Sequence, residues 1–289
     1  MTLSPAQAAT SLEPAEIAER LVRARLDRRP LSEFPGGALP PELAVSYAAQ
    51  DLAIDLWPDE VAGWKVGRIP TELQESLGAE RLCGPIFSRR VQIASGAGPT
   101  AFPVFQGGFT AVEAEFVYRL AADAPADKTD WTPAEALSLV DGLHMGVEIA
   151  ASPLAAINIL GPLAVASDFG NNDGLILGPE LVGWRDRTDE SLICATEIDG
   201  VTVGEGSAAS LAGGPAASLA FLLNNTARRG RPLRRGCLVT TGAATGIHDI
   251  RAGQTARISF GEFGEILCVA QPDPAAASSG GNDEHDDKA

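Results

Sequence analysis

The sequence predicts an α+β fold, on three observations. Two stretches near the N-terminus, at about residues 11–28 and 41–57, have helical spacing of apolar residues. From residue 63 onward the pattern changes to short strand-like runs separated by glycine and proline. These runs do not alternate regularly with helices, as a parallel β-α-β arrangement would require. A helical N-terminal part followed by a strand-rich body therefore fits the chain best.

The sequence indicates where the first N-terminal helix begins and where the second one ends. Ser11 can cap the first helix through its hydroxyl, and Pro14 fits the first turn. Pro58 ends the second helix. Apolar residues repeat at helical spacing in each helix, as Ile17, Leu21 and Ala24 and as Leu43, Tyr47 and Ile54. We expect residues 1–62 to form a helical N-terminal cap.

Three further elements can be placed in the body, which we expect to span residues 63–271. Residues 132–135 form a capping box with proline at the first helical position, so a short helix should begin there. A longer helix should run over 215–229. The runs 257–260 and 265–268 flank a glycine-containing turn and predict a hairpin.

Composition and charge restrict the class of protein. The chain of 289 residues carries a net charge of −16, which argues against nucleic acid and anionic membranes as partners, because both require a basic surface. No apolar stretch approaches the roughly 20 residues of a membrane span, and the first residues lack the pattern of a secretory signal. Residues 272–289 are dominated by Pro, Ala, Ser, Gly and acids, and we expect a disordered acidic tail.

The cysteines indicate the compartment. All four are widely spaced and form neither a CxxC pair nor a dense framework (Cys83, Cys194, Cys237 and Cys268). Such cysteines are typical of a reducing environment, so we expect a cytoplasmic protein. Its partner should be a small molecule.

Three glutamates and one lysine at strand-like positions are the strongest functional signal. Glu113 and Glu115 lie in TAVEAEFVYRL, Glu148 lies in GLHMGVEIAAS, and Lys65 lies in GWKVGRIP. Side chains two apart in a strand share a face, about 6.5–7 Å apart along the backbone. Neighbouring carboxylates repel each other, and a divalent cation removes that conflict, with a third carboxylate completing an oxygen-only site. Alternatively, Glu113 and Glu115 lie on a solvated strand face and Glu148 is unrelated.

These residues belong to an ordered series of segments. The series reads GWKVGRIP (63–70), QESLGAERLCGPIF (74–87), VEAEF (112–116), GVEIA (146–150), SDFGNNDGLILGP (167–179), GEGSAASLAGGP (204–215), FLLNNTARRGRPLRRGCLVTTGA (221–243) and AGQTARISFGEFGEI (252–266). The series resembles the fumarylacetoacetate hydrolase superfamily, specifically its 2-keto-4-pentenoate hydratase / 2-oxohepta-3-ene-1,7-dioate hydratase branch. The resemblance covers most of residues 45–270, and the order is more specific than any one segment.

The resemblance implies a mixed β-sandwich roll of the fumarylacetoacetate hydrolase type, with a metal site in its mouth. Glu113, Glu115 and Glu148 would bind Mg²⁺ or Mn²⁺. Lys65 would line the active site as an acid–base residue, although a lysine between apolar neighbours often extends to the surface instead. The implied activity is hydration of a 2-hydroxy-dienoate or 2-oxo-enoate acid during breakdown of aromatic ring-cleavage products. The resemblance also implies that the protein forms a homo-oligomer, and no other feature of the sequence indicates this.

Two further places are candidates. The resemblance brings Asp168 towards the metal site, where it would orient a water or a ligand carboxylate; an ordinary turn would account for the same residues. Thr241 and Gly242 match a strand-end pair of the family and could hold the substrate carboxylate through the hydroxyl and exposed amides. That turn could also be purely structural.

More than one function stays open because the chain departs from the hydratases, which usually continue after the third glutamate with valine-aspartate-serine-arginine. Here Glu148 is followed by Ile-Ala-Ala-Ser-Pro. A decarboxylase of the 4-oxalocrotonate type would use the same chemistry with one extra carboxylate-binding arginine, for which Arg68, Arg89 and Arg90 are candidates. An acylpyruvate C–C hydrolase generally relies on a histidine–glutamate pair, and no histidine precedes His144. A non-catalytic binding protein that keeps the fold should lack a stoichiometric metal ion.

Overall fold

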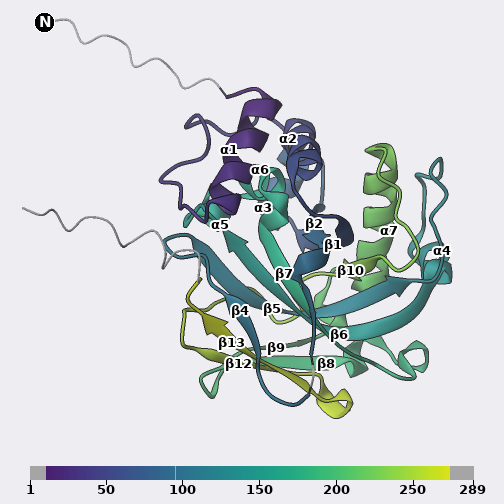
Figure 1. Ribbon diagram of the computed structural model, residues 1–289. Helices are drawn as coiled ribbons and strands as arrows, with labels where there is room; N and C mark the ends of the chain where they lie inside the picture. Colours follow the sequence, from purple (N-terminus) through teal and green to yellow (C-terminus); the bar gives the residue numbers. More distant parts are fainter. Residues whose placement is uncertain (1–10, 95, 274–289) are drawn as a thin grey trace, which may run out of the picture.

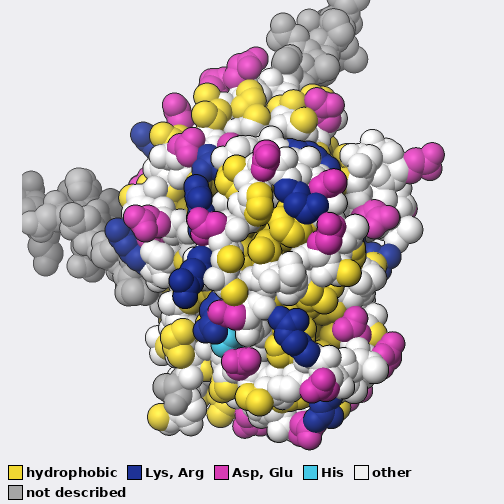
Figure 2. Space-filling view, turned by 90° about the vertical axis from the view of Figure 1, so that its right-hand side faces the viewer, with side chains coloured by type: hydrophobic (Ala, Val, Ile, Leu, Met, Phe, Trp, Pro, Cys, Tyr) yellow, Lys and Arg dark blue, Asp and Glu magenta, His cyan; other side chains and the backbone are white. Residues whose placement is uncertain are grey.

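The computed structural model describes residues 11–94 and 96–273, which form two β-sheets with helices gathered along one side (Figure 1). The predicted acidic tail, 272–289, lies outside the described residues except for its first two positions. On the face shown in Figure 2, acidic and basic side chains are interspersed with hydrophobic ones, so neither charge sign forms a single large patch there.

The larger sheet carries the candidate site. Its eight strands are β1 (Val61–Arg68), β2 (Arg81–Phe87), β3 (Val91–Ile93), β5 (Phe109–Leu120), β6 (Val140–Ser152), β7 (Asn172–Glu180), β10 (Leu238–Thr240) and β11 (His248–Asp249). They lie in the order β2-β1-β10-β5-β6-β7-β3, with β11 also paired to β5. The long antiparallel pair β5–β6 is at the centre, and β1 is separated from β5 only by β10.

The smaller sheet closes the sandwich. Its strands are β4 (Thr100–Pro103), β8 (Ile193–Ile198), β9 (Val201–Ser207), β12 (Thr255–Ser259) and β13 (Glu265–Gln271), in the order β4-β13-β12-β8-β9. The hairpin predicted at 257–268 is the antiparallel pair β12–β13. Phe116 of β5 meets the ring of Phe260 edge to face with centroids 5.6 Å apart, so the core lies between the sheets.

The two N-terminal helices are α1 (Pro14–Leu26) and α2 (Leu43–Leu56), and they pack against each other at the top of Figure 1. The prediction that Ser11 caps the first helix is wrong. Glu13 is the N-cap residue because Pro14 takes the first helical position, and the Ser11 hydroxyl donates to the Leu12 carbonyl instead. The division of the chain into two parts after residue 62 stays a prediction. In the structure the first strand, β1, already begins at Val61.

The remaining helices are α3 (Thr71–Leu77), α4 (Pro133–Ala136), α5 (Ile157–Leu160), α6 (Pro162–Ser167) and α7 (Gly214–Arg228). The capping box predicted for α4 is present: Thr132 Oγ1 accepts from the Glu135 amide, and the Glu135 carboxylate accepts from the Thr132 amide. The predicted long helix is α7, which begins one residue early. Within residues 11–94 and 96–273, no helix combines the length and apolar character that crossing a membrane requires.

Candidate metal and substrate site

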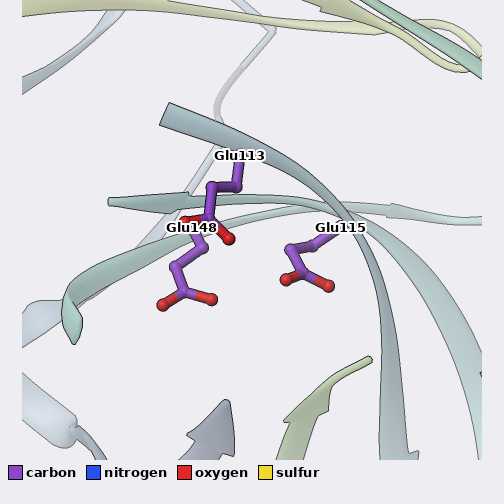
Figure 3. A group of neighbouring side chains, drawn as sticks. All are labelled: Glu113, Glu115 and Glu148. Atoms are coloured by element: carbon purple, nitrogen blue, oxygen red, sulfur yellow. The ribbon is translucent and has the colours of Figure 1, made fainter. Parts of the chain in front are cut away.

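Three buried carboxylates from two neighbouring strands form a cluster. Glu113 and Glu115 come from β5 and Glu148 from β6, and the β5–β6 register pairs Glu113 directly with Glu148. Each residue offers one carboxylate oxygen, and these oxygens lie within 4.8 Å of one another. Figure 3 shows the three side chains on one side of the sheet. The structure therefore brings the three predicted ligands together, away from solvent.

The hydrogen bonds of the cluster leave acceptors free for a ligand. Glu115 Oε2 accepts the Thr241 and Gly242 amides at 2.9 and 2.7 Å, whereas Glu113 Oε1 and Glu115 Oε1 are buried without a hydrogen-bond partner. Buried acceptors without a partner are rare and call for an explanation such as an ion. A set of carboxylate oxygens is what hard cations such as Mg²⁺ and Mn²⁺ prefer. The residues present therefore fit a divalent cation.

The charges of the cluster also favour a cation. Burial raises the pKa of Glu113 to about 7, although Lys65 acts against it. Burial, together with the charges of Glu148 and Glu113, raises the pKa of Glu115 well above its ordinary value. Burial and mutual repulsion therefore oppose full ionisation of these carboxylates, and a bound divalent cation would relieve both effects.

The metal-free protein should lose stability as the pH rises from about 5 to about 8. Glu113 and Glu115 hold their protons in the native state above the pH at which they release them in the unfolded chain. Stability falls wherever the native state binds more protons than the unfolded state. The unfolding temperature of a Glu115→Gln variant should decline less over this range, and Mg²⁺ should reverse much of the wild-type decline. Identical pH profiles for the two metal-free proteins would contradict this explanation.

Lys65 lies beside the cluster and does not extend to the surface. It comes from β1, where it pairs with Thr240 of β10, and only 4% of the residue is exposed. Its Nζ is 3.3 Å from Glu148 Oε1 and donates to Asn171 Oδ1 at 3.3 Å. Burial alone would lower the pKa of Lys65, but the three carboxylates outweigh it and raise that pKa. In the metal-free site the lysine is therefore charged, and its ammonium group contacts Glu148 and Asn171.

The Thr241–Gly242 turn lines the same cavity as Lys65, but its polar groups have partners within the protein. Both amides donate to Glu115, as described above, and the Thr241 hydroxyl donates to the Phe116 carbonyl at 2.7 Å. In this arrangement the turn orients Glu115. Binding of a substrate carboxylate by the turn stays a prediction.

Asp168 lies in a separate buried cluster. Its Oδ1 accepts from Arg25 Nε at 2.5 Å, and its Oδ2 accepts from the Ser152 hydroxyl at 2.6 Å. It does not line the cavity. Its expected role beside a water or a ligand stays a prediction, and this placement does not favour it.

Four residues to which the sequence assigned no role surround the expected ones. Asn171 contacts Lys65, Asn172 and Thr240 contact Glu148, and Arg25 binds the backbone next to them. The polar stretch around Asn171 was recognisable as a turn. Nothing local could connect Arg25, in the first helix, with the glutamates more than 85 positions later.

The cluster opens into a cavity of about 740 Å³, which is within the usual range for small-molecule sites. Lys65, Glu113 and Asn171 contribute to its wall, and most of the remaining lining is apolar, including Leu73, Leu82, Leu160, Val165 and Leu211. Arg68 and Arg81 also line it and face each other across the β1–β2 pair.

The other two arginines considered from the sequence lie elsewhere. Neither Arg89 nor Arg90 lines this cavity. The Arg89 side chain is 76% exposed near Asp59, and Arg90 lies 4.0 Å from Asp173.

Comparisons with known proteins show which proteins this chain is similar to. No family model matches the chain. The chain is 27% identical over 260 residues to the 2-keto-4-pentenoate hydratase of Burkholderia vietnamiensis (strain G4 / LMG 22486), covering 87% of this chain and 95% of the relative. It is 29% identical over 137 residues to a 4-oxalocrotonate decarboxylase of Pseudomonas sp, of which it covers only about half, 52%.

Solved structures share the fold. The 4-oxalocrotonate decarboxylase of Pseudomonas putida G7, complexed with magnesium and adipate, matches with a TM-score of 0.74 at 19% identity, over 91% of this chain and 100% of that one. The fumarylpyruvate hydrolase of Pseudomonas aeruginosa, in complex with Mn²⁺ and pyruvate, matches with a TM-score of 0.52 at 16% identity, over 73% and 89%. These comparisons confirm the resemblance to the fumarylacetoacetate hydrolase superfamily, and the chain has the fold of that superfamily.

Proposed function

We propose that the protein is a divalent-metal-dependent hydratase that adds water to a 2-hydroxy-dienoate or 2-oxo-enoate acid. The observation that carries the proposal is the buried trio Glu113, Glu115 and Glu148 with Lys65 beside it, next to a cavity of substrate size. The similarity to a 2-keto-4-pentenoate hydratase over most of both chains supports this reaction.

The proposal includes a biological setting. The reaction would serve the breakdown of aromatic ring-cleavage products in the cytoplasm, by a homo-oligomeric enzyme. The four cysteines support a reducing compartment, because all four are free.

The metal would be Mg²⁺ or Mn²⁺, held by the three glutamates. When bound, it would supply positive charge that polarises the carbonyl of a 2-oxo acid and favours its enolate. Three of the solved structures that share the fold are described with magnesium, calcium or Mn²⁺, all of which accept oxygen ligands. The protein's own part is to keep the glutamates fixed: the Thr241 and Gly242 amides hold Glu115, and Asn172 and Thr240 hold Glu148.

Lys65 would move the protons. With 2-hydroxypenta-2,4-dienoate as substrate, the enol O–H is lost and C5 gains a proton, giving an unsaturated ketone. Water then adds its hydroxyl to C4 and a proton to C3, which gives 4-hydroxy-2-oxopentanoate. The Lys65 ammonium, held between Glu148 and Asn171 on the cavity wall, would supply the proton to C5 and recover the enol proton.

Decarboxylation of a 2-oxo-3-enedioate such as 4-oxalocrotonate is the second candidate, and one observation favours it. Arg68 and Arg81 face each other on the cavity wall, although like charges opposite each other in a sheet repel. Arg81 is partly neutralised by Glu80, whereas Arg68 donates to the uncharged Thr71 hydroxyl at 3.3 Å. A second substrate carboxylate would relieve the repulsion and bind both guanidinium groups.

Carbon–carbon bond hydrolysis and a purely binding role have less support. The described residues that line the cavity include no histidine, so the histidine–glutamate pair of an acylpyruvate hydrolase has no counterpart there. Metal analysis of the purified protein separates a non-catalytic binding protein from an enzyme, because a binding protein that only keeps the fold should lack a stoichiometric metal ion.

An absorbance assay with 2-hydroxypenta-2,4-dienoate and 4-oxalocrotonate tests the proposal. We expect Mg²⁺-dependent loss of the dienol absorbance with the first substrate, a 4-hydroxy-2-oxo acid as product, and inhibition by a chelator. Consumption of 4-oxalocrotonate alone, with release of CO₂, would replace hydration by decarboxylation. Turnover of neither substrate at any Mg²⁺ or Mn²⁺ concentration would refute both assignments.

Arginine variants separate the two reactions. If decarboxylation is the activity, Arg68→Met should lower kcat/KM for 4-oxalocrotonate by about tenfold or more, because it removes a charge-assisted contact to the second carboxylate. A matched Arg89→Met variant, altered on the exposed surface, should retain the wild-type value. Equal effects of both variants would show that Arg68 does not select a dicarboxylate.

A further inference from the structure

Two adjacent asparagines in one short turn, Asn171 and Asn172, contact the candidate site at two places, Lys65 and Glu148. The Asn172 side-chain amide donates to Glu148 Oε1 at 3.1 Å, and Asn171 Oδ1 accepts from Lys65 Nζ at 3.3 Å. Both asparagines are buried. One therefore touches an expected metal ligand and the other touches the expected proton donor.

The turn that presents them has an uncommon backbone. Phe169, Gly170 and Asn171 have φ values of 53°, 64° and 58°, so three consecutive residues lie in the left-handed region. This conformation is unfavourable for residues with a side chain and persists only where the surroundings enforce it. Strained backbone of this kind concentrates at functional sites.

One feature that allows the turn is a glycine in the facing strand. Gly84 of β2 pairs with Lys65 of β1, and a Cβ added to Gly84 would lie 2.0 Å from the Phe169 carbonyl oxygen. Only glycine therefore lets the turn lie this close to the strand beside Lys65. The Phe169 ring is fixed as well, by edge-to-face packing on Phe87 and Trp57.

The second feature is a buried clamp from helix α1. The Arg25 guanidinium, 2% exposed, donates to the carbonyls of Asn172, Ala151 and Asp168 at 2.9, 2.8 and 3.1 Å. It also pairs with the Asp168 carboxylate and lies over the Phe169 ring. Arg25 thus joins the end of β6, the turn and the start of β7. A planar guanidinium with several donors in a fixed fork suits this task.

We propose that Asn172 and Asn171 are positioning residues with separate tasks: Asn172 fixes Glu148 for the metal, and Asn171 fixes Lys65 for proton transfer. The inference rests on the proposed metal-dependent function. It extends that function to a turn held in place by Arg25, so that the first helix of the chain supports the metal centre.

Metal binding tests the task of Asn172. We expect Asn172→Ala to weaken Mn²⁺ binding by about 10- to 100-fold, the usual cost of losing a group that orients a metal ligand. Titration calorimetry measures this affinity. Asn172→Ser has a polar side chain that is too short to reach Glu148, and it should weaken Mn²⁺ binding to the same extent. This variant replaces Asn172→Ala in the experiment if the alanine variant does not fold. Wild-type Mn²⁺ affinity in a folded variant would overturn the assignment.

Proton transfer tests the task of Asn171. We expect Asn171→Gly, which tolerates the left-handed conformation, to lower kcat by about tenfold or more while Mn²⁺ affinity stays within about threefold. An Asn171→Gly protein that loses Mn²⁺ affinity but keeps the wild-type kcat would overturn the division of tasks between the two asparagines.

A matched control and the wild type complete the experiment. Asn224→Ala loses side-chain hydrogen bonds to the Trp131 backbone, away from the site, and should change neither quantity. A wild-type protein that binds no Mn²⁺ would refute the proposed function itself. Wild-type binding with unaffected asparagine variants would refute only this inference.

Discussion

Replacing Glu115 by glutamine should abolish Mg²⁺-dependent turnover and leave the protein folded. One Glu115 oxygen accepts from two backbone amides, which hold the carboxylate in position. The other oxygen is buried without a hydrogen-bond partner and is therefore available to bind a metal ion. Glutamine has nearly the same shape but no negative charge. We expect the rate to fall by about 1000-fold or more, because the charge stabilisation supplied by the metal is lost with the ion. The measurement is the initial rate of dienol loss at saturating Mg²⁺, together with the unfolding temperature.

A glutamate outside the site provides the matched control. Glu265 of β13 pairs with Arg257 on the surface, and Glu265→Gln should keep the rate within about twofold of wild type. Retained Mg²⁺-dependent turnover in a folded Glu115→Gln protein would refute the assignment of Glu115 as a ligand.

Replacing Lys65 by methionine should separate metal binding from chemistry. The substitution keeps an unbranched side chain in the buried position and removes the ammonium that contacts Glu148 and Asn171. We expect kcat to fall by about 100- to 10,000-fold, the usual contribution of a positioned acid–base group. Mn²⁺ affinity should stay the same or increase, because the lysine no longer competes with the ion for the carboxylates.

Lys128→Met is the control for this substitution. Lys128 lies on the surface near Asp130 and Glu135, and its loss should change neither kcat nor Mn²⁺ affinity. If Lys65→Met retained wild-type kcat, or lost the metal, Lys65 would not be the acid–base residue.

The strand pattern allowed much of this site to be predicted from the sequence. Alternation along one strand predicts that Glu113 and Glu115 share a face, and the structure has them on that face of β5. Glu148 required the family resemblance, because its place opposite Glu113 depends on the β5–β6 register, which no local pattern reveals.

The residues around the ligands could not be predicted in the same way. Asn171 and Asn172 reach the site only because a left-handed turn brings them there, and that turn depends on Gly84 in another strand. Arg25 contacts residues about 125 to 150 positions away, through contacts that exist only after the helix has packed.

Hydrogen-bond partners were the hardest feature to predict. The sequence placed Asp168 and Thr241 near the site as groups facing a ligand. In the structure the Asp168 carboxylate is bound by Arg25 and Ser152, and the Thr241 hydroxyl donates to Phe116. Buried polar groups form hydrogen bonds with the groups that the fold brings next to them, and these groups come from distant segments of the chain.

Titration of the metal-free protein with Mn²⁺, followed by electron paramagnetic resonance, tests the central claim most directly. We expect a single saturable ion per chain, its loss in Glu115→Gln, and a changed Mn²⁺ spectrum when a simple 2-oxo acid such as pyruvate is added. A protein that binds no Mn²⁺, or that binds it equally well without Glu115, would contradict the claim that these carboxylates hold a metal for a 2-oxo acid substrate.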